Sequence, residues 1–454
     1  MKIRQFCAAM LPFAATAIAA APACADMTIK FANLRPDANT LAAYVSFGGG
    51  GTFTATDIKT NAVLAKGVSY PVSSLTKGIS IHEFSSGRIY VSLGAKLVTP
   101  VAGNGFSPNF DNPNLKDFAT RWDKVEITFV PGSGGANLSA QDFFGIPLKI
   151  VSKGGGQTAT TLTWRSDTAP IMSALAKLAG SAVITKTNAT GAIAKGGQGV
   201  TVPGISGKVV RIVSPASVAP KNAAGATVYP SFAAYVKYLR TGNPSNPGQP
   251  VKTSIVGNNG AIGQGGPLQT YNLVATVANS AGTIGGASVM TGDLVLTGSV
   301  NSGAGNVATT ILVAAANLSD HAIYGANPSY SIVKGANTNA IAEKTLADYF
   351  AALNFGFPGS AVNNPDENGT AIGASPSWTW YGNRPNGVNR KPLPIKDAFA
   401  FAQPAKKTYY NGYAAYLTGV SDAYGFAYND RLQSPLAPLG DGSVLTLSVL
   451  PDTQ

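Results

Sequence analysis

Charged residues are scarce in this 454-residue chain, at 12% of the sequence. They are also unbalanced, because 33 Lys and Arg residues against 21 Asp and Glu residues give a net charge of +12. The basic residues are scattered and do not form the short basic runs typical of nucleic-acid-binding segments. We therefore expect no nucleic-acid partner. The positive charge favours at most an attraction to an anionic cell surface.

Cysteine and histidine are almost absent, since only Cys7, Cys24, His82 and His321 occur. Both cysteines lie in a segment that we predict to be removed, which excludes disulfides, a thiolate nucleophile and cysteine metal ligands. Two histidines are too few for a histidine-built zinc site. No G-x-S-x-G turn is present to hold the serine of a Ser-His-acid triad. The sequence therefore predicts no metal and no cofactor.

Long apolar runs are also missing beyond the N-terminus. There, Lys2 and Arg4 precede an apolar run that ends in A-C-A before Asp26, which is typical of a secretory leader cleaved after Ala25. Cleavage leaves 429 residues (454 minus 25) and removes two positive charges, so the net charge falls from +12 to +10. Cys24 leaves a lipoprotein open, but the preceding A-P-A lacks the usual large aliphatic residue. We expect export, either to the periplasm or outside the cell, without stable membrane insertion.

The first part of the mature chain has the pattern of β-strands. Short runs with partial alternation of apolar and polar residues are separated by Gly, Pro and Asn, which is typical of an antiparallel sandwich or barrel. These runs are MTIKFANL, AAYVSFGG, GRIYVSLGAKLV, KVEITFV and GIPLKIVSKG. We predict a β-barrel domain over residues 26–165, bordered by residues 405–454.

Residues 166–404 have a mixed pattern, which predicts an α/β domain. Helices are expected at Ala169–Leu178, Pro230–Arg240 and Ala340–Leu353, where apolar residues recur at helical spacing. The stretch at about 250–315 is rich in glycine but contains GDLVLTGSV and TTILVAAANL, and we interpret it as a β-rich elaboration with glycine turns. The fold class expected for the whole chain is mainly β with an α+β part, and the two domains would form a wide groove.

Two carboxylates stand on either side of a turn in an otherwise apolar region. Alternation in the strand from Trp122 to Val130 places Glu126 on the polar face, and the chain reverses over Pro131–Ala136 before it reaches Asp142. If the two segments pair, both carboxylates line one cleft. From the pattern alone, two solvated charges at an edge of a sheet are the more common outcome.

The surrounding motifs resemble a known enzyme family. W-D-x-V-E-x-T-F, from residue 122, and N-L-S-x-x-D-F-F-G-I-P-L, from residue 137, resemble the catalytic segments of glycoside hydrolase family 64. GRIYVSLG, VVRIVSP, ADYFAALNFG and NGYAAYLTGVSDAYGFAYND resemble further segments of that family, in the same order along the chain. Members of this family are endo-acting β-1,3-glucanases of the laminaripentaose-producing type with a thaumatin-like barrel.

The resemblance implies a function for the two carboxylates. It implies that Glu126 is the general acid and Asp142 the general base of a hydrolysis that inverts the anomeric carbon. Such a pair stands about 6.5–9.5 Å apart, which leaves room for the attacking water. Thr128 matches a family position that helps to hold the substrate. The sequence departs from the family at Val130, where a polar residue is usual, and at Gly135, where an aromatic is usual.

Aromatic side chains are candidates for the walls of the cleft, because sugar rings present flat C–H faces to them. We expect Trp378, Trp380 and Tyr381 to bind substrate, although burial in the core is an equally common fate for such a cluster. Tyr409, Tyr410 and Trp164 are further candidates for such walls. The expected protein is a secreted, monomeric endo-β-1,3-glucanase acting on β-1,3-glucan of laminarin or fungal walls. The alternatives are a non-catalytic thaumatin-like protein that binds carbohydrate at the cell surface, and a structural protein.

Overall fold

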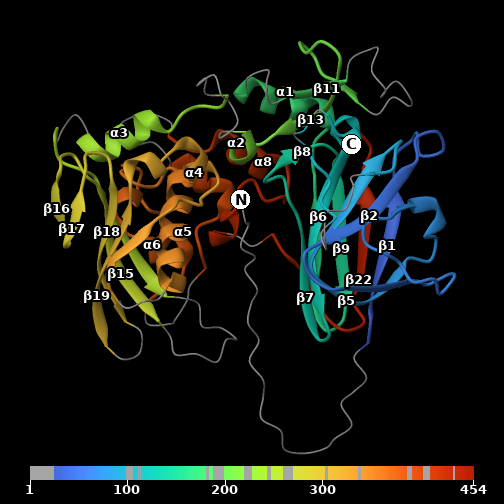
Figure 1. Ribbon diagram of the computed structural model, residues 1–454, viewed down its shortest axis with the longest axis horizontal. Helices are drawn as coiled ribbons and strands as arrows, with labels where there is room; N and C mark the ends of the chain where they lie inside the picture. Colours follow the sequence, from blue (N-terminus) through green and yellow to red (C-terminus); the bar gives the residue numbers. More distant parts are fainter. Residues whose placement is uncertain are drawn as a thin grey trace, which may run out of the picture.

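The computed structural model places the chain in two lobes that lie side by side (Figure 1). The structure describes residues 25–453, with gaps at 99–105, 111, 113, 180–183, 188–198, 219–227, 243–246, 259–268, 302–304, 336–338, 386–390, 402–408 and 433–434. The first part of the chain and its last strands form one lobe, and the middle of the chain forms the other. All of the predicted leader except Ala25 lies outside the described residues.

One lobe is built on a sheet that has eleven strands among the described residues. Its hydrogen-bonded order is β10-β9-β22-β1-β5-β6-β7-β21, with β2 and β3 paired to β5 and β4 paired to β2. The end strands β10 and β21 contact each other, so the sheet curves into a nearly closed barrel. The mainly β fold predicted from the sequence is confirmed. The strands are β1 (Met27–Asn33), β2 (Ala43–Gly49), β3 (Phe53–Asp57), β4 (Ser69–Pro71), β5 (Ile79–Leu93), β6 (Trp122–Val130), β7 (Ser133–Leu138), β9 (Leu148–Gly154), β10 (Gln157–Thr163), β21 (Ala437–Leu439) and β22 (Val444–Val449).

The last strand of the chain lies inside this sheet. β22 is hydrogen-bonded between β1 and β9 and runs parallel to β1, with Thr28 opposite Val444 and Asn33 opposite Val449. Leu445 and Leu447 are buried in the core of the barrel. The C-terminal segment, expected to border the barrel, therefore supplies two of its strands.

The alternation predicted for β6 sorts its side chains between core and surface. Val125, Ile127 and Phe129 are at most 2% exposed and belong to the main hydrophobic core. Burial of each such side chain stabilises the fold by about 1.5–3 kcal/mol. Because side chains alternate along a strand, Lys124 and Glu126 lie on the other face.

The turn between β6 and β7 is tighter than the sequence indicates. The reversal was expected over Pro131–Ala136, but β7 begins at Ser133 and only Pro131 and Gly132 lie between the strands. Gly132 has a φ of 93° and a Cβ there would have open space, so the backbone conformation is what favours glycine at this position. Gly134 and Gly135, which look like turn residues in the sequence, pair with Phe129 and Thr128.

A small second sheet and three helices connect the lobes at the top of the view in Figure 1. Strand β13 is at the centre of this sheet and pairs with β8, β11 and β12. The elements are β8 (Phe143–Phe144), β11 (Ile184–Thr187), β12 (Val200–Thr201), β13 (Lys208–Val213), α1 (Thr168–Leu178), α2 (Pro215–Val218) and α8 (Gly412–Val420). Strand β8 directly follows Asp142, so this sheet helps to set the position of that carboxylate.

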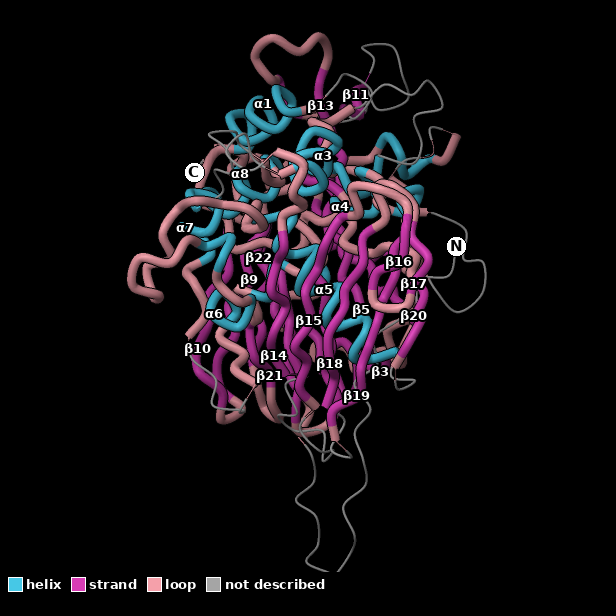
Figure 2. Tube along the Cα trace, turned by 90° about the vertical axis from the view of Figure 1, so that its left-hand side faces the viewer, coloured by secondary structure: helices cyan, strands magenta, loops and turns pink. Residues whose placement is uncertain are grey.

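The other lobe contains a five-stranded antiparallel sheet with the order β14-β15-β18-β19-β20 among the described residues. Figure 2 shows its long strands side by side. The predicted β-rich elaboration supplies most of them, so the lobe has one continuous sheet where loosely alternating strands and helices were expected. The strands are β14 (Lys252–Asn258), β15 (Thr270–Val277), β18 (Leu294–Asn301), β19 (Asn306–Val313) and β20 (Ser331–Lys334), with the separate hairpin β16 (Gly282–Ile284) and β17 (Ala287–Val289).

Helices cover this sheet, and the longest of them, α5, contacts β14 and β15. The expected helix at Ala340–Leu353 corresponds to α5, and the expected helix at Ala169–Leu178 corresponds to α1. The expected helix at Pro230–Arg240 begins later, at Ala233, and the Phe232 backbone N–H just before it donates to the Asp320 carboxylate at 2.7 Å. The helices of this lobe are α3 (Ala233–Thr241), α4 (Asp320–Tyr324), α5 (Asn339–Phe355), α6 (Ser377–Tyr381) and α7 (Ile395–Ala398).

In the part of the chain that the structure describes, no helix is long and apolar enough to cross a membrane. The same residues contain no group of three His, Cys, Asp or Glu side chains placed to hold a metal ion.

Candidate active site

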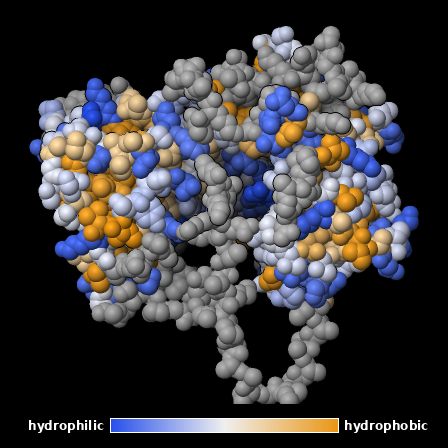
Figure 3. All heavy atoms as spheres, viewed as in Figure 1, coloured by the Kyte–Doolittle hydropathy of each residue, from blue (hydrophilic) through white to orange (hydrophobic). Residues whose placement is uncertain are grey.

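A polar strip runs along one face of β5, β6 and β7, and β6 and β7 lie on the side of the barrel lobe nearer the other lobe (Figure 1). The ladder sets Arg88 of β5 opposite Glu126 of β6, and Glu126 opposite Asn137 of β7. Thr128 lies two residues further along the same face of β6 and is exposed. The space-filling view is hollowed between the two lobes and strongly hydrophilic there (Figure 3).

Asp142 lies beside this strip, at the end of the segment that follows β7. Its backbone carbonyl accepts the Ser214 N–H at 2.8 Å, and the Tyr413 hydroxyl donates to the Ala140 carbonyl at 2.9 Å. The next two residues, Phe143 and Phe144, are buried as β8. The backbone of Asp142 is therefore held between the barrel and the connecting elements, while its side chain remains 40% exposed.

Asp123, the other carboxylate of the W-D-x-V-E motif, is buried and holds the segment that follows Asp142. Asp123 is 4% exposed and accepts the backbone N–H groups of Lys124, Gly145 and Ile146 at 2.8–3.0 Å. Burial raises the pKa of Asp123 to about 6, although these three N–H groups and the Lys124 charge act in the opposite direction. Asp123 therefore ties residues 145 and 146 to strand β6.

Two cations, Lys124 and Arg88, lie next to the candidate catalytic carboxylates. Lys124 forms an ion pair with Asp142 Oδ2, and Arg88 Nε lies 3.8 Å from Glu126 Oε1. Arg88 also interacts electrostatically with Asp142, which shows that all four charges face one region. Burial favours the protonated form of Asp142, but Lys124 outweighs it, with help from Arg88 and Ser217, and lowers the pKa of this carboxyl.

The structure thus brings Glu126, Asp142 and Thr128 to one face, as the sequence predicts. The sequence analysis did not single out Arg88, Asp123 or Lys124. The signal was present, because alternation puts Lys124 on the same face as Glu126, and charged residues are rare in this chain.

An aromatic cluster closes one end of the strip. Tyr90 and Trp122 pack edge to face with ring centroids 5.7 Å apart, and Trp122 meets Phe143 at 4.6 Å. The Arg211 guanidinium carbon lies 5.4 Å from both the Trp122 and Phe143 ring centres and its Nη1 donates to the Phe118 carbonyl at 2.8 Å. The rings pack against one another and leave Glu126 and Thr128 as the open part of the strip.

The predicted SWTWY wall is largely core, which corrects the expected substrate-binding role of Trp380 and Tyr381. Trp380 is 0% exposed, packs 5.3 Å from Phe357 and donates its Nε1–H to the Ile372 carbonyl. Tyr381 is 7% exposed and its hydroxyl donates to the Asp348 carbonyl. Trp378 is only half-buried, but the Arg384 guanidinium stacks on its ring at 4.9 Å. The side chains of Trp380 and Tyr381, both on α6, therefore lie in the core.

The other aromatic candidates also have partners within the fold. Tyr409 stacks on Tyr235 with ring centroids 4.9 Å apart, and Trp164 packs 4.2 Å from Phe144. Tyr410 packs against Phe399. These rings therefore contribute to packing.

At Gly135, where the sequence departs from the resembled family, a side chain from another segment of the chain packs close to the backbone. A Cβ at Gly135 would lie 2.7 Å from Leu436, which precedes β21 and is 42% exposed. Leu436 thus covers the strip on the β7 side.

Comparisons with known proteins agree with this geometry. Residues 27–239 match the sequence profile of glycoside hydrolase family 64, described as β-1,3-glucanase. No curated protein sequence matches the chain at a significant level.

The fold is shared with solved structures. One is a laminaripentaose-producing β-1,3-glucanase in complex with laminaritetraose, 16% identical, with a TM-score of 0.52 over 95% of this chain and 100% of that chain. Another is a family 64 β-1,3-glucanase domain from Clostridium beijerinckii, 15% identical, with a TM-score of 0.52 over 93% of this chain and 98% of that chain.

The mainly β fold, the carboxylates on one face and the profile match together define a glycoside hydrolase of the β-1,3-glucanase class. Residues 27–239, which match the model of glycoside hydrolase family 64, carry both carboxylates. The resemblance seen in the sequence is confirmed.

Proposed function

We propose that this protein is an endo-acting hydrolase that cleaves bonds inside β-1,3-glucan chains. The cleavage is a single displacement that inverts the anomeric carbon. The observation that carries the proposal is the pair of carboxylates on one face. Asp142 is held ionised by the Lys124 ammonium, and Glu126 lies on the same face with Arg88 Nε 3.8 Å from its Oε1. A single displacement needs two such carboxylates, one to donate a proton and one to accept it.

In this mechanism Glu126 acts as the general acid. Its protonated carboxyl donates a proton to the glycosidic oxygen as the bond from that oxygen to the anomeric carbon breaks. Its position beside the exposed Thr128, two residues along the same face, places the donor next to a side chain that can hold a sugar hydroxyl.

Asp142 acts as the general base on the opposite side of the sugar. The ionised carboxylate removes a proton from water as the water oxygen attacks the anomeric carbon. The lowered pKa keeps Asp142 ionised, as a general base must be.

The β-1,3-glucan substrate is supported by the family match and by a fold relative that was crystallised with laminaritetraose. The hollow between the lobes is hydrophilic, as a site for a polyhydroxylated chain requires (Figure 3). We further propose that the protein acts as a monomer.

The test is digestion of laminarin by the purified protein. We expect the release of reducing ends, and proton NMR at early times should show the α anomer, because inversion of a β linkage produces it. Early release of the β anomer would contradict the inverting mechanism. Binding of laminarin without release of reducing ends would contradict hydrolysis and support a non-catalytic carbohydrate-binding protein.

We also propose export with cleavage before Asp26. Asp26, the first residue after the predicted cleavage site, is anchored to the barrel, since its carboxylate accepts the Ser80 hydroxyl at 2.7 Å and lies 3.1 Å from His82 Nδ1. Edman sequencing of the protein recovered from periplasm or medium should begin at Asp26. A mature protein that begins at a lipidated Cys24 would instead establish a membrane anchor.

A further inference from the structure

Lys124 is a buried cation on the active face. Its side chain is 4% exposed, which is rare for lysine because removal of an ammonium from water is unfavourable unless it is paired. Its ammonium lies 5.4 Å from the Phe143 ring centre, and it forms an ion pair with Asp142. Burial alone would lower the pKa of Lys124, but Asp142 and Glu126 raise it by more, so the group stays charged.

The ion pair leaves one oxygen of Asp142 for chemistry. Lys124 binds Oδ2, whereas Oδ1 faces the Ser217 hydroxyl of α2 at 3.4 Å, which is a long hydrogen bond. A base that removes a proton from water needs one oxygen directed at that water. The pairing of Lys124 with Oδ2 therefore sets the direction of Oδ1.

The backbone cannot set this direction by itself. The hydrogen bonds of Asp123 and Ser214 hold the main chain around residue 142, but the carboxylate still rotates about its own side-chain bonds. Strand β6 is the rigid element here, since it pairs on both sides with β5 and β7. The ion pair with Lys124, which lies on this strand, therefore restrains the Asp142 side chain as well.

We propose that Lys124 is a positioning residue, which holds the Asp142 carboxylate in the orientation needed to activate the hydrolytic water. This inference rests on the proposed function of Asp142 as the general base. A consequence is that the base stays ionised, and the enzyme active, at lower pH than an unpaired carboxylate would allow.

Several other groups act on Asp142 and must be kept in place. Glu126 lies on β6, Arg88 faces Asp142 from β5, Ser217 contacts it from α2, and Tyr413 interacts with it from α8. Arg88 favours ionised Asp142, as Lys124 does, whereas the Glu126 charge opposes it. Glu126, Arg88, Ser217 and Tyr413 are therefore left unchanged in the test.

The test compares Lys124→Met, which keeps an unbranched side chain one atom shorter and removes the charge, with the wild type. We expect kcat at neutral pH to fall about 10²-fold with little change in KM, because a misdirected base affects the chemical step. The acidic limb of the kcat/KM profile should move to higher pH. Lys124→Arg keeps the charge and should restore part of kcat.

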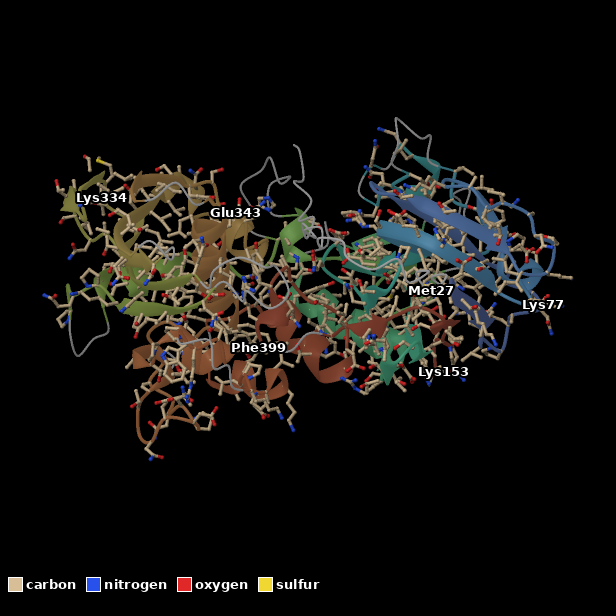
Figure 4. All side chains as sticks on the ribbon, turned by 90° about the horizontal axis from the view of Figure 1, so that it is seen from below. Met27, Lys77, Lys153, Lys334, Glu343 and Phe399 are labelled. Carbon is tan, nitrogen blue, oxygen red and sulfur yellow. The ribbon has the colours of Figure 1, made fainter. Side chains whose placement is uncertain are left out.

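The control is Lys153→Met, which removes the same charge at an exposed position on β9, on the outside of the barrel lobe (Figure 4). Its kinetics and pH profile should match those of the wild type. If Lys124→Met does not fold, Lys124→Gln, which can still hydrogen-bond, takes its place.

Titration of the Asp142 carboxyl carbon by ¹³C NMR, assigned by its loss in Asp142→Asn, gives a readout that does not depend on activity. Its midpoint should rise in Lys124→Met and not in Lys153→Met. An unchanged midpoint and acidic limb in Lys124→Met would overturn the proposal. If the wild type does not cleave glucan but the midpoint still rises, the ion pair is established and the proposed function has failed separately.

Discussion

Arg121 and Asp452 lie 331 residues apart and form a two-bond ion pair, with Nη1–Oδ2 and Nη2–Oδ1 distances of 2.8 and 2.5 Å. Arg121 is 1% exposed, and its Nε also donates to the Gly145 carbonyl at 2.8 Å. Asp452 accepts Arg35 Nη1 as well, at 2.8 Å. The end of the chain is therefore tied to the start of β6 and to the loop that carries Asp142.

Asp452→Asn should lower the free energy of unfolding by about 3 kcal/mol, because it removes the carboxylate charge that is paired with the buried Arg121 guanidinium. The two arginines hold the pKa of Asp452 well below its usual range. A depressed pKa means that this stabilisation is complete above the unfolded pKa and is lost as the pH falls through the folded one. Urea unfolding at neutral pH and at pH about 3 measures both effects. Asp37→Asn, which affects only the more exposed pair with Arg35, is the matched control and should change stability by about 1 kcal/mol or less.

Glu126→Gln and Asp142→Asn should each reduce turnover of laminarin by at least about 10²-fold, because each removes one half of the acid–base pair. Glucan affinity, measured by calorimetry, should remain, since neither change alters the shape of the strip. Azide should rescue Asp142→Ala, if at all, by attack in place of water, which gives a glycosyl azide of inverted configuration. Turnover like the wild type in both amide variants would show that the pair is structural.

Thr128→Ala and Trp380→Ala should separate substrate binding from core packing. Thr128 is exposed beside Glu126, so its truncation should raise KM and leave unfolding unchanged. Trp380 is fully buried, so its truncation should reduce the free energy of unfolding by about 3–5 kcal/mol. A Trp380→Ala protein of normal stability with weak glucan binding would show that Trp380 binds substrate and does not serve in core packing.

Adjacent glycines of β7 should respond differently to the same substitution. In Gly134→Ala the new Cβ would lie 2.2 Å from the Thr128 backbone carbonyl oxygen, so a backbone strand must move and stability should fall by more than about 2 kcal/mol. In Gly135→Ala the new Cβ meets the half-exposed Leu436 side chain, which can rotate away, so the loss should be below about 1 kcal/mol. Equal losses measured by thermal unfolding would mean that Leu436 is held as rigidly as the backbone.

Asp123 should make part of the stability depend on pH in the opposite direction to Asp452. Its folded pKa of about 6 lies above the usual value, so the folded state binds the proton more readily and gains stability as the pH falls from about 6 toward 4. Asp123→Asn does not titrate there. As the pH falls from about 6 toward 4, the unfolding free energy of the wild type should therefore rise relative to that of Asp123→Asn. A constant difference would show that Asp123 keeps an ordinary pKa.

The sequence alone determined the strands and the face on which each side chain lies. Alternation placed Val125, Ile127 and Phe129 in the core and Glu126 on the polar face, because side chains of a strand point to opposite sides whatever it pairs with. The motifs around Glu126 and Asp142 also led to the family, since they preserve residue types that the chemistry needs. Local pattern likewise located the helices at Thr168–Leu178 and Asn339–Phe355.

Only the tertiary structure decided which distant segments meet. Nothing in the spacing of residues shows that β22 inserts beside β1, that Leu436 covers Gly135, or that Trp380 points into the core. The same holds for the Lys124–Asp142 ion pair, because a strand pattern gives the face of Lys124 but not the loop that packs on it. Such contacts depend on the free energy of packing the whole chain, in which each segment is placed by partners hundreds of residues away.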